Sequence, residues 1–455
     1  MDVSYSIEGN IVDIERRKIF KGKISVEGNK ILDILPCDVK NDCFILPGLI
    51  DSHVHIESSM LIPSEFAKNA LRHGTVASLC DPHEIANVCG IEGVLFMLEN
   101  AQTADYNFFF GAPSCVPATF FETSGAILDS ASVGQLLRRK DIFFLSEMMN
   151  YPGVINMDNE VIKKLDAARK YKKPIDGHAP GLVGNDLKKY ASQGISTDHE
   201  SFSYDEAVEK INCGMSIMIR EGSAARNFES LYKLIDVYPE KIMLCTDDIH
   251  PDDFFSGYID SIVRRALSKG LDVFNILKAA CINPVKHYKI PVGTLKKNDW
   301  ADFIVVNNLK DFIILQTYIK GKPLIKNEAL KNEELKPVLL NNFHAEKIKP
   351  EYIKVEWLSD SMNVIEAFDG ELTTKKISVK PFVENNLVVS DVDNDILKLV
   401  VVNRYQNQKP KVGFLKNFGL KKGALASSIA HDSHNIIAVG ANDDDICAAI
   451  NSLVE

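Results

Sequence analysis

One stretch decides the fold of this chain: Phe44-Ile45-Leu46-Pro47-Gly48-Leu49-Ile50-Asp51-Ser52-His53-Val54-His55. Its apolar beginning, interrupted by Pro and Gly, predicts a short buried strand near residues 45–50. Side chains alternate along a strand, so His53 and His55 lie on one face. Two imidazoles on one face can bind one divalent ion. Because such a pair can equally be two unrelated surface histidines, residues further along the chain must decide between the two.

Four more polar residues occupy equivalent places, each after a strand-like run and before a helix-like run. They are Glu147, His178, His199 and Asp247, which come after residues 142–146, 174–177, 195–198 and 242–246. A (β/α)8 barrel carries its active site at the C-terminal ends of its strands. Together with His53 and His55, these residues are six candidate metal ligands at one end of such a barrel.

The alternation of strand and helix patterns predicts an α/β fold with a (β/α)8 TIM-like barrel at residues 48–290. The eight expected strands lie near residues 45–50, 75–79, 107–112, 142–147, 174–178, 195–199, 215–220 and 242–247. The Asn283-Pro284 step is expected to end the last barrel helix. Strand patterns in residues 1–47 and 291–330 predict a small β-sandwich domain built from both sides of the barrel. Residues 340–455 predict a C-terminal α+β domain.

The composition excludes several classes of protein. The chain has 455 residues, a formal net charge of −10 and a pI of about 5.7, which argues against a nucleic-acid partner. It has no apolar run of membrane-spanning length and no signal-peptide pattern at its start, so we expect a cytoplasmic protein with no membrane partner. The nine cysteines form no C-x-x-C pair, which is typical of reduced, buried thiols.

The six candidate ligands suit two neighbouring divalent ions. His53, His55 and Asp247 suit one ion, His178 and His199 suit the other, and the carboxylate of Glu147 can bridge both. A shared hydroxide would then exist at neutral pH, and Asp247 could take its proton and pass it to a leaving amine. Alternatives remain open from spacing alone: Asp248 competes with Asp247, and Glu147 could be an exposed ion-pair partner.

Several longer motifs resemble the amidohydrolase superfamily and, within it, the adenine deaminases. The motifs are Pro47 to Met60 with its Glu57-Ser58-Ser59-Met60 end, Asp81-Pro82-His83-Glu84, Asp176-Gly177-His178-Ala179-Pro180-Gly181, Thr197-Asp198-His199-Glu200, Arg220-Glu221-Gly222-Ser223, Thr246-Asp247-Asp248 and His431-Asp432-Ser433-His434-Asn435. The H-x-H pair alone is common among hydrolases, whereas the combination is specific to adenine deaminases. The resemblance covers nearly the whole chain.

The resemblance implies hydrolysis of adenine to hypoxanthine and ammonia, with adenine and water as substrates. It implies two Mn²⁺ or Fe²⁺ ions, with Zn²⁺ as a third option, and the same six ligands. Glu147 stands where many superfamily members carry a carbamylated lysine, which favours the deaminase branch. Members of this branch extend further beyond the His434-Asn435 run, so we expect a shortened C-terminal domain. We also expect a homodimer or a higher homo-oligomer.

Other residues receive roles as hypotheses. Asp247 is expected to be a catalytic proton shuttle, and His83 and Glu84 to act on the purine, with a structural turn as the equal alternative. Substrate-binding roles are expected for Arg220, Glu221, Asp432 and His434. The alternative for Arg220 and Glu221 is a buried ion pair, and the alternative for Asp432 and His434 is a role in folding. Two rival functions are a cyclic amide hydrolase of the same superfamily and a shortened, inactive homologue that binds metal or assembles subunits.

Overall fold

The computed structural model describes residues 4–324, 340–370 and 372–455. Two compact units make up the chain, and each is described by itself. The first comprises Met1–His83, Val94–Cys115 and Leu128–Val338, and the second comprises Glu84–Gly93, Val116–Ile127 and Leu339–Glu455. The predicted end of the β-domain at residue 330 lies outside the described residues.

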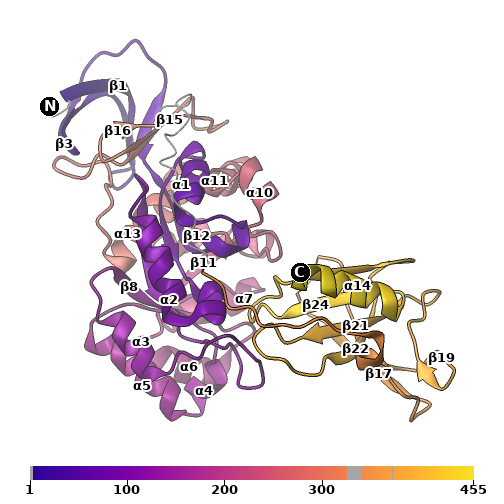
Figure 1. The fold of residues 1–455 in the computed structure, drawn as a ribbon. Coiled ribbons are helices and arrows are strands. Elements are labelled where there is room, and N and C mark those ends of the chain that lie inside the picture. The colour runs from indigo at the N-terminus through magenta and orange to yellow at the C-terminus, as the bar shows by residue number, and fades with distance from the viewer. Residues whose placement is uncertain (1–3, 325–339, 371) are drawn as a thin grey trace. The chain divides into compact units, whose positions relative to one another are not determined.

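Eight strands form the centre of the first unit, in two sheets whose neighbouring strands pair in parallel, and they confirm the predicted barrel (Figure 1). They are β5 (Leu49–His55), β6 (Thr75–Cys80), β7 (Asn107–Ala112), β8 (Ile142–Met148), β9 (Ile175–Gly177), β10 (Thr197–Asp198), β11 (Ser216–Arg220) and β12 (Ile242–Cys245). Every residue of β5, β6, β11 and β12 is buried. Burial on both faces is expected for parallel strands covered by helices.

The last strand closes the barrel onto the first. After β12 and one intervening residue, β13 (Asp247–Asp248) pairs in parallel with β5, which places Asp247 opposite Val54 and Asp248 opposite His55. The C-terminal end of the eighth strand therefore lies beside the H-x-H pair. Closure of the barrel brings residues together that are almost two hundred positions apart in the chain.

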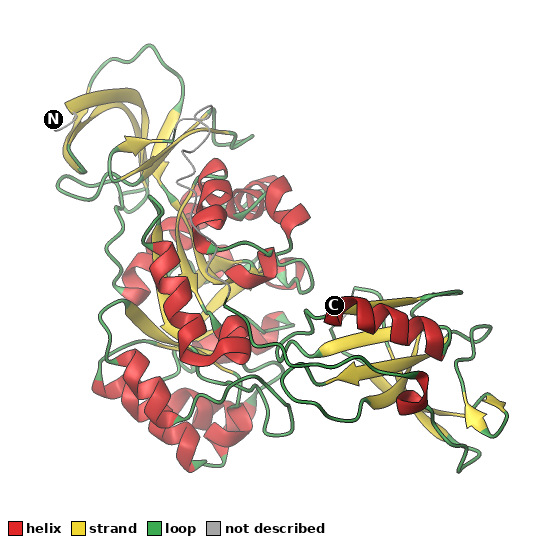
Figure 2. Cartoon of the chain, in the orientation of Figure 1, coloured by secondary structure: helices red, strands yellow, loops and turns green. Residues whose placement is uncertain are grey.

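Helices surround the barrel strands, as Figure 2 shows in red around yellow. They are α1 (Pro63–Arg72), α2 (His83–Ala101), α3 (Ser130–Leu137), α4 (Tyr151–Ile155), α5 (Asn159–Lys170), α6 (Gly184–Ser192), α7 (Tyr204–Asn212), α8 (Phe228–Leu231), α9 (Leu234–Val237), α10 (Pro251–Ser256), α11 (Ile259–Ser268), α12 (Val273–Leu277) and α13 (Asn283–Tyr288), with a 3₁₀ turn η1 (Ile56–Ser59). None of the described helices has the length and apolar character needed to cross a lipid bilayer.

The expected helix end at Asn283-Pro284 is wrong. Helix α12, a π-helical turn η2 (Lys278–Ile282) and α13 succeed one another without a break, and Pro284 lies in the first turn of α13. A proline is tolerated in the first turn because its missing N–H would find no partner there. The step therefore begins a new helical segment.

A seven-stranded sheet flanks the barrel and takes strands from both sides of it, as predicted. Its order is β16 (Lys322–Pro323), β15 (Ile314–Ile319), β14 (Phe303–Val306), β4 (Phe44–Pro47), β1 (Ser4–Asp13), β2 (Lys18–Glu27) and β3 (Lys30–Pro36). The domain is built as one continuous sheet, not as two separately hydrogen-bonded ones. The expected strand at residues 45–50 divides at Gly48, where a Cβ atom would lie 2.2 Å from Val76. Only glycine fits at this junction between the sheet and the barrel.

The second unit is an α+β domain with a six-stranded sheet. Its order is β18 (Lys375–Val379), β17 (Met362–Glu366), β22 (Lys411–Lys416), β21 (Ile396–Val402), β24 (Ile436–Gly440) and β23 (Ala424–Ser427). Helix α14 (Asp443–Val454) packs through Ile446 and Ile450 against apolar residues of β21 and β24. A two-stranded hairpin, β19 (Val383–Glu384) with β20 (Leu387–Val388), and a 3₁₀ turn η3 (Pro350–Ile353) complete it.

Candidate metal centre

Glu147 lies at the centre of the barrel mouth, near the end of β8. Its two carboxylate oxygens face different histidines. Oε1 lies 4.0 Å from Nε2 of His53 and 3.4 Å from Nε2 of His55. Oε2 lies 2.6 Å from Nδ1 of His178 and 3.2 Å from Nε2 of His199. One carboxylate thus spans two pairs of imidazoles, which is the arrangement that a bridging ligand requires.

Asp247 completes the group on the side of the first pair. Its Oδ1 lies 3.5 Å from Nε2 of His53 and 3.0 Å from Nε2 of His55. The structure therefore brings all six predicted ligands together. Donor atoms of His53, His199 and Asp247 lie within 4.8 Å of one another, as do those of Glu147, His178 and His199. Because His199 belongs to both sets, the two sets are overlapping parts of one cluster that could hold cations.

Hydrogen bonding of the imidazoles tests whether these residues fit metal ions. Both ring nitrogens of His53 and Nε2 of His199 are buried and form no hydrogen bond of normal geometry among the described residues, although Asp247 and Glu147 lie 3.5 and 3.2 Å from the two Nε2 atoms. A buried polar atom without a partner costs free energy, and a cation would satisfy it. His55 differs, since its Nδ1 lies 3.0 Å from the carbonyl oxygen of Asp81, which leaves Nε2 directed at Glu147 and Asp247. This orientation is typical of metal-binding histidines.

The charges of the group also suit cations. Burial raises the pKa of Glu147, but the charge and hydrogen bond of His178 outweigh it and hold that pKa well below its usual range. Burial lowers the pKa of His178, but Glu147 raises it to about 9. A metal ligand must be the neutral imidazole, so a divalent ion competes for the place that this proton takes.

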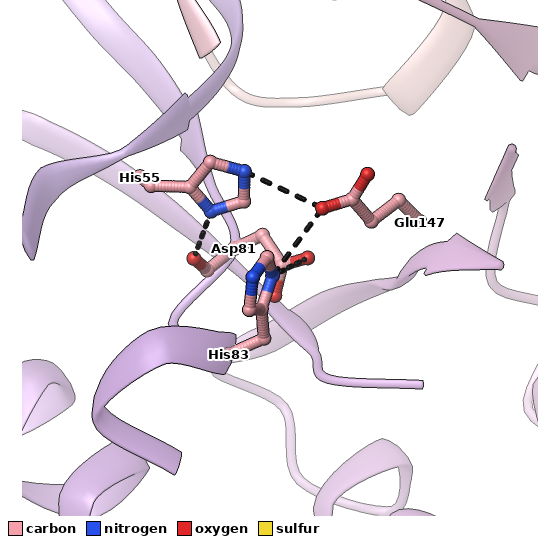
Figure 3. A group of neighbouring side chains, drawn as sticks. All are labelled: His55, Asp81, His83 and Glu147. Atoms are coloured by element: carbon pink, nitrogen blue, oxygen red, sulfur yellow. Dashed lines mark hydrogen bonds and ion pairs between the residues drawn. The ribbon is translucent and has the colours of Figure 1, made fainter. Parts of the chain in front are cut away.

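Two further residues, Asp81 and His83, extend the cluster, as Figure 3 shows. Nδ1 of His83 lies 3.3 Å from Oε1 of Glu147 and 3.1 Å from Oδ2 of Asp81. The sequence pattern predicts His83 at the barrel mouth but assigns no role to Asp81. The signal for Asp81 is its place directly after β6, which is the position that His178 and His199 hold after β9 and β10. Asp81 and His83 extend the group beyond the six ligands.

Arg220 and Glu221 have separate surroundings. The Arg220 guanidinium is buried, donates to Glu200, and lies 2.5 Å from Oδ2 of Asp247. This is the buried ion pair that is the alternative to substrate binding. Burial raises the pKa of Asp247, but Arg220 and the two nearby histidines hold it well below its usual range. Glu221 instead pairs with Arg265 and accepts a hydrogen bond from the Phe228 amide.

Within the second unit, Glu84 contacts the His431–Asn435 run. Oε2 of Glu84 lies 3.4 Å from Nε2 of His434, and Oε1 lies 3.5 Å from Nε2 of His431. Asp432 lies 2.8 Å from His431. Glu84 and His434 are both buried. Glu84, predicted to be catalytic, thus contacts His434, predicted to bind substrate.

Comparisons with known proteins agree with this geometry. Residues 44–324 match the amidohydrolase family, and residues 371–455 match the adenine deaminase C-terminal domain. The chain is 55% identical to an adenine deaminase of Methanosarcina barkeri over 98% of its own length and 83% of that protein. It is 48% identical to an adenine deaminase of Salinibacter ruber over 100% of its length and 84% of the relative. The chain belongs to the adenine deaminases.

Membership of the adenine deaminases makes this chain a hydrolase of carbon–nitrogen bonds, and the amidohydrolase family implies that it uses divalent metal. Solved structures support the fold of the deaminase. A β-aspartyl dipeptidase from Fervidobacterium islandicum matches 73% of this chain and 100% of its own, with a TM-score of 0.55 and 16% identity. An N-acetyl-D-glucosamine-6-phosphate deacetylase from Mycobacterium smegmatis matches 70% of this chain and 100% of its own, with a TM-score of 0.52 and 10% identity.

Proposed function

We propose that this adenine deaminase works with two divalent ions, one held by His53, His55 and Asp247, and one by His178 and His199, with Glu147 shared. The reaction is the hydrolytic deamination of adenine to hypoxanthine and ammonia. The observation that carries the proposed centre is the carboxylate of Glu147, whose two oxygens face the two histidine pairs. When bound, such ions supply an activated water at neutral pH.

Asp247 is proposed to move the proton. A carboxylate is ionised at neutral pH, so Asp247 can accept a proton while water attacks the amine-bearing carbon of adenine. It then returns the proton to the amino group, which leaves as ammonia. Arg220 holds Oδ2 of the carboxylate at 2.5 Å, so Oδ1 stays directed at the histidines. This contact gives Arg220 a role in orienting Asp247.

The purine ring is assigned to the remaining predicted residues. His83 has its Nδ1 within reach of Asp81, which can fix the tautomer of the ring and the direction of Nε2. Glu84, Asp432 and His434 are assigned to the purine from their motifs, and within the second unit Glu84 contacts His434. The contacts of Glu221 with Arg265 and Phe228 support a structural role for that residue more than substrate binding.

Three finer assignments belong to this proposal. The metal is Mn²⁺ or Fe²⁺, since imidazole with carboxylate suits both, and Zn²⁺ is the third option. A cytoplasmic location agrees with nine cysteines that are all free thiols. Assembly into a homodimer or a higher homo-oligomer agrees with the exposed rings of Phe120 and Phe121, which are 98% and 75% exposed in the second unit.

One assay tests the proposed function. Purified protein, stripped of metal and reloaded with Mn²⁺, should convert adenine to hypoxanthine and release ammonia, and the product should keep its ring intact. A cyclic amide hydrolase would open the ring of a cyclic amide and leave adenine unchanged. An inactive homologue would bind Mn²⁺ without turnover. Failure to form hypoxanthine at any metal loading contradicts the proposal.

A further inference from the structure

The two histidine pairs are held by backbone of very different regularity. His53 and His55 belong to β5, a seven-residue strand that pairs with β6 on one side and β13 on the other. His178 and His199 lie one residue beyond β9 and β10, strands of three and two residues. The backbone ladder ends before these two ligands, so side chains must hold their loops: the Tyr190 hydroxyl accepts from the His178 amide at 3.1 Å, and Asn227 donates to the carbonyl oxygen of His199 at 2.9 Å.

A fully buried lysine supplies contacts to both loops. Lys210 lies on α7 and is 0% exposed. Its Nζ donates to the carbonyl oxygen of Ala179, the residue after His178, at 2.8 Å. It also donates to Oδ2 of Asp198, which precedes His199, at 2.8 Å. One ammonium group therefore contacts the neighbour of each histidine.

Two carboxylates extend this contact along the loops. Asp198 accepts from the Ala179 amide at 3.0 Å and from the Glu200 amide at 3.2 Å. Glu206 accepts from Lys210 at 2.8 Å, from the Gly181 amide at 2.9 Å, and from the Phe202 amide at 3.1 Å. Asp198 and Glu206 are also buried. The three side chains join residues 179–181 and 198–202 to helix α7.

The burial of these three charged side chains costs free energy. Burial of one ammonium and two carboxylates loses much of their hydration, and replacement of such groups by apolar residues is often neutral or stabilising. An ordered hydrogen-bond network around metal ligands has a different value, because it fixes the directions of the ligands. None of the three side chains is itself among the six proposed ligands.

We propose that Lys210, with Asp198 and Glu206, is a positioning group for the second metal ion, the one assigned to His178 and His199. The group holds the two loops in register with each other and leaves His53 and His55 to their strand. Loss of this group should lower the affinity for the second ion and leave the affinity for the first ion unchanged. This inference rests on the proposed function, because it needs a two-metal centre.

Metal binding of the full chain tests the proposal. Lys210→Met and Glu206→Gln should each lower the affinity for one of the two Mn²⁺ ions by about 10- to 100-fold, the usual effect of losing a partner of a metal ligand. At a Mn²⁺ concentration that just fills both sites of the wild type, elemental analysis should then give about one ion per chain in the variants and about two in the wild type. The electron paramagnetic resonance spectrum should change from that of a coupled pair to that of an isolated Mn²⁺ ion.

Glu209→Gln is the matched control. Glu209 lies on the same helix and accepts from the Gly184 amide at 2.7 Å, outside the two ligand loops. This variant should bind both ions as the wild type does. Glu206→Gln keeps the shape of the side chain and leaves Lys210 paired with Asp198, so it tests the proposal if Lys210→Met does not fold.

The outcomes separate the inference from the function on which it rests. A wild type that binds two ions, with variants that lose thermal stability but keep both ions and the coupled spectrum, overturns the inference alone and leaves the network a folding role. A wild type that binds a single ion overturns the two-metal centre and this inference with it. Loss of one ion in both variants, with Glu209→Gln unchanged, supports the proposal.

Discussion

At the scale of single residues, the carboxylate of Glu147 distinguishes this centre from a simple histidine cluster. A carboxylate has two oxygens, and here each faces a different pair of imidazoles. The choice of glutamate at the end of β8 thus permits one side chain to serve two ions. Asp247 likewise uses both oxygens, one toward the histidines and one toward Arg220.

Glu147→Gln should reduce the occupancy of both metal sites. The amide keeps the volume of the side chain, but it loses the negative charge and one of the two equivalent oxygens. We expect fewer than one ion per chain under conditions where the wild type holds about two. Elemental analysis after dialysis measures this. Two tightly held ions in the variant would contradict the bridging role.

Asp247→Asn should lower kcat by at least ~100-fold, the usual scale for a general acid–base group. KM for adenine should change less, because Asp247 is assigned to a metal ion and to the proton and not to the purine. Asp248→Asn is the matched comparison, since Asp248 lies next in the chain and contacts the hydroxyl of Ser58. Steady-state assays decide between them. If Asp248→Asn lost most of its activity and Asp247→Asn stayed nearly normal, the proton shuttle would be Asp248.

At the scale of elements, buried carboxylates join neighbouring strands below the ligands. Asp176 on β9 accepts from Thr197 on β10 at 2.8 Å and from the hydroxyl of Tyr288 on α13 at 2.8 and 2.9 Å. On the other side of the barrel, Asp51 accepts from the hydroxyl of Thr246 at 2.5 Å and from the amide of His53 at 3.1 Å. These contacts hold strand ends together where the backbone ladder is short.

The Asp176 contact predicts a pH dependence of stability. Burial raises the pKa of Asp176 from 3.8 to about 7, although its hydrogen bonds oppose the shift. The folded state therefore keeps a proton that the unfolded state has already lost between about pH 4 and 7. The free energy of unfolding of the metal-free protein should then fall as the pH rises through this range, by up to ~1.4 kcal/mol per pH unit from this residue.

Asp176→Asn should flatten that dependence, because the amide does not titrate and keeps an oxygen acceptor for Thr197 and Tyr288. Urea denaturation of both proteins at pH 5, 6, 7 and 8 measures the slopes. Equal slopes for the wild type and the variant would assign the pH dependence to other groups.

At the scale of the whole molecule, the chain joins a metal-dependent barrel to an α+β domain with its own apolar core. The start of α2 belongs to the second unit by its contacts, and Glu84 in that segment contacts His434 of the domain. Glu84, from the motif after β6, and His434, from near the end of the chain, are therefore in contact.

His434→Ala should lower kcat/KM for adenine by at least ~10-fold, with a smaller effect on thermal stability, if His434 takes part in substrate binding. His344→Ala is the control, because His344 is a histidine of the same unit that lies outside the His431–Asn435 run. Thermal denaturation and steady-state kinetics of both variants provide the readouts. Unchanged kinetics with a lowered melting temperature would leave His434 a folding role.

Local patterns determined the order of the elements and the positions of the six candidate ligands. The candidate ligands stand at or close to the ends of short apolar runs, and strand direction then places these ends at one mouth. Asp81 obeys the same rule on β6, so the signal for it is present in the sequence although the pattern assigns it no role. The predicted helix end at Pro284 is wrong because proline is compatible both with the end of a helix and with its first turn.

The three-dimensional arrangement of the strands sets which groups meet across the barrel. It assigned each oxygen of Glu147 to one histidine pair, Arg220 to Asp247, and Glu221 to Arg265. It also directed Lys210 to the loops of His178 and His199. These choices depend on the closure of the strands and on the approach of side chains from distant parts of the chain, which spacing along a sequence does not specify.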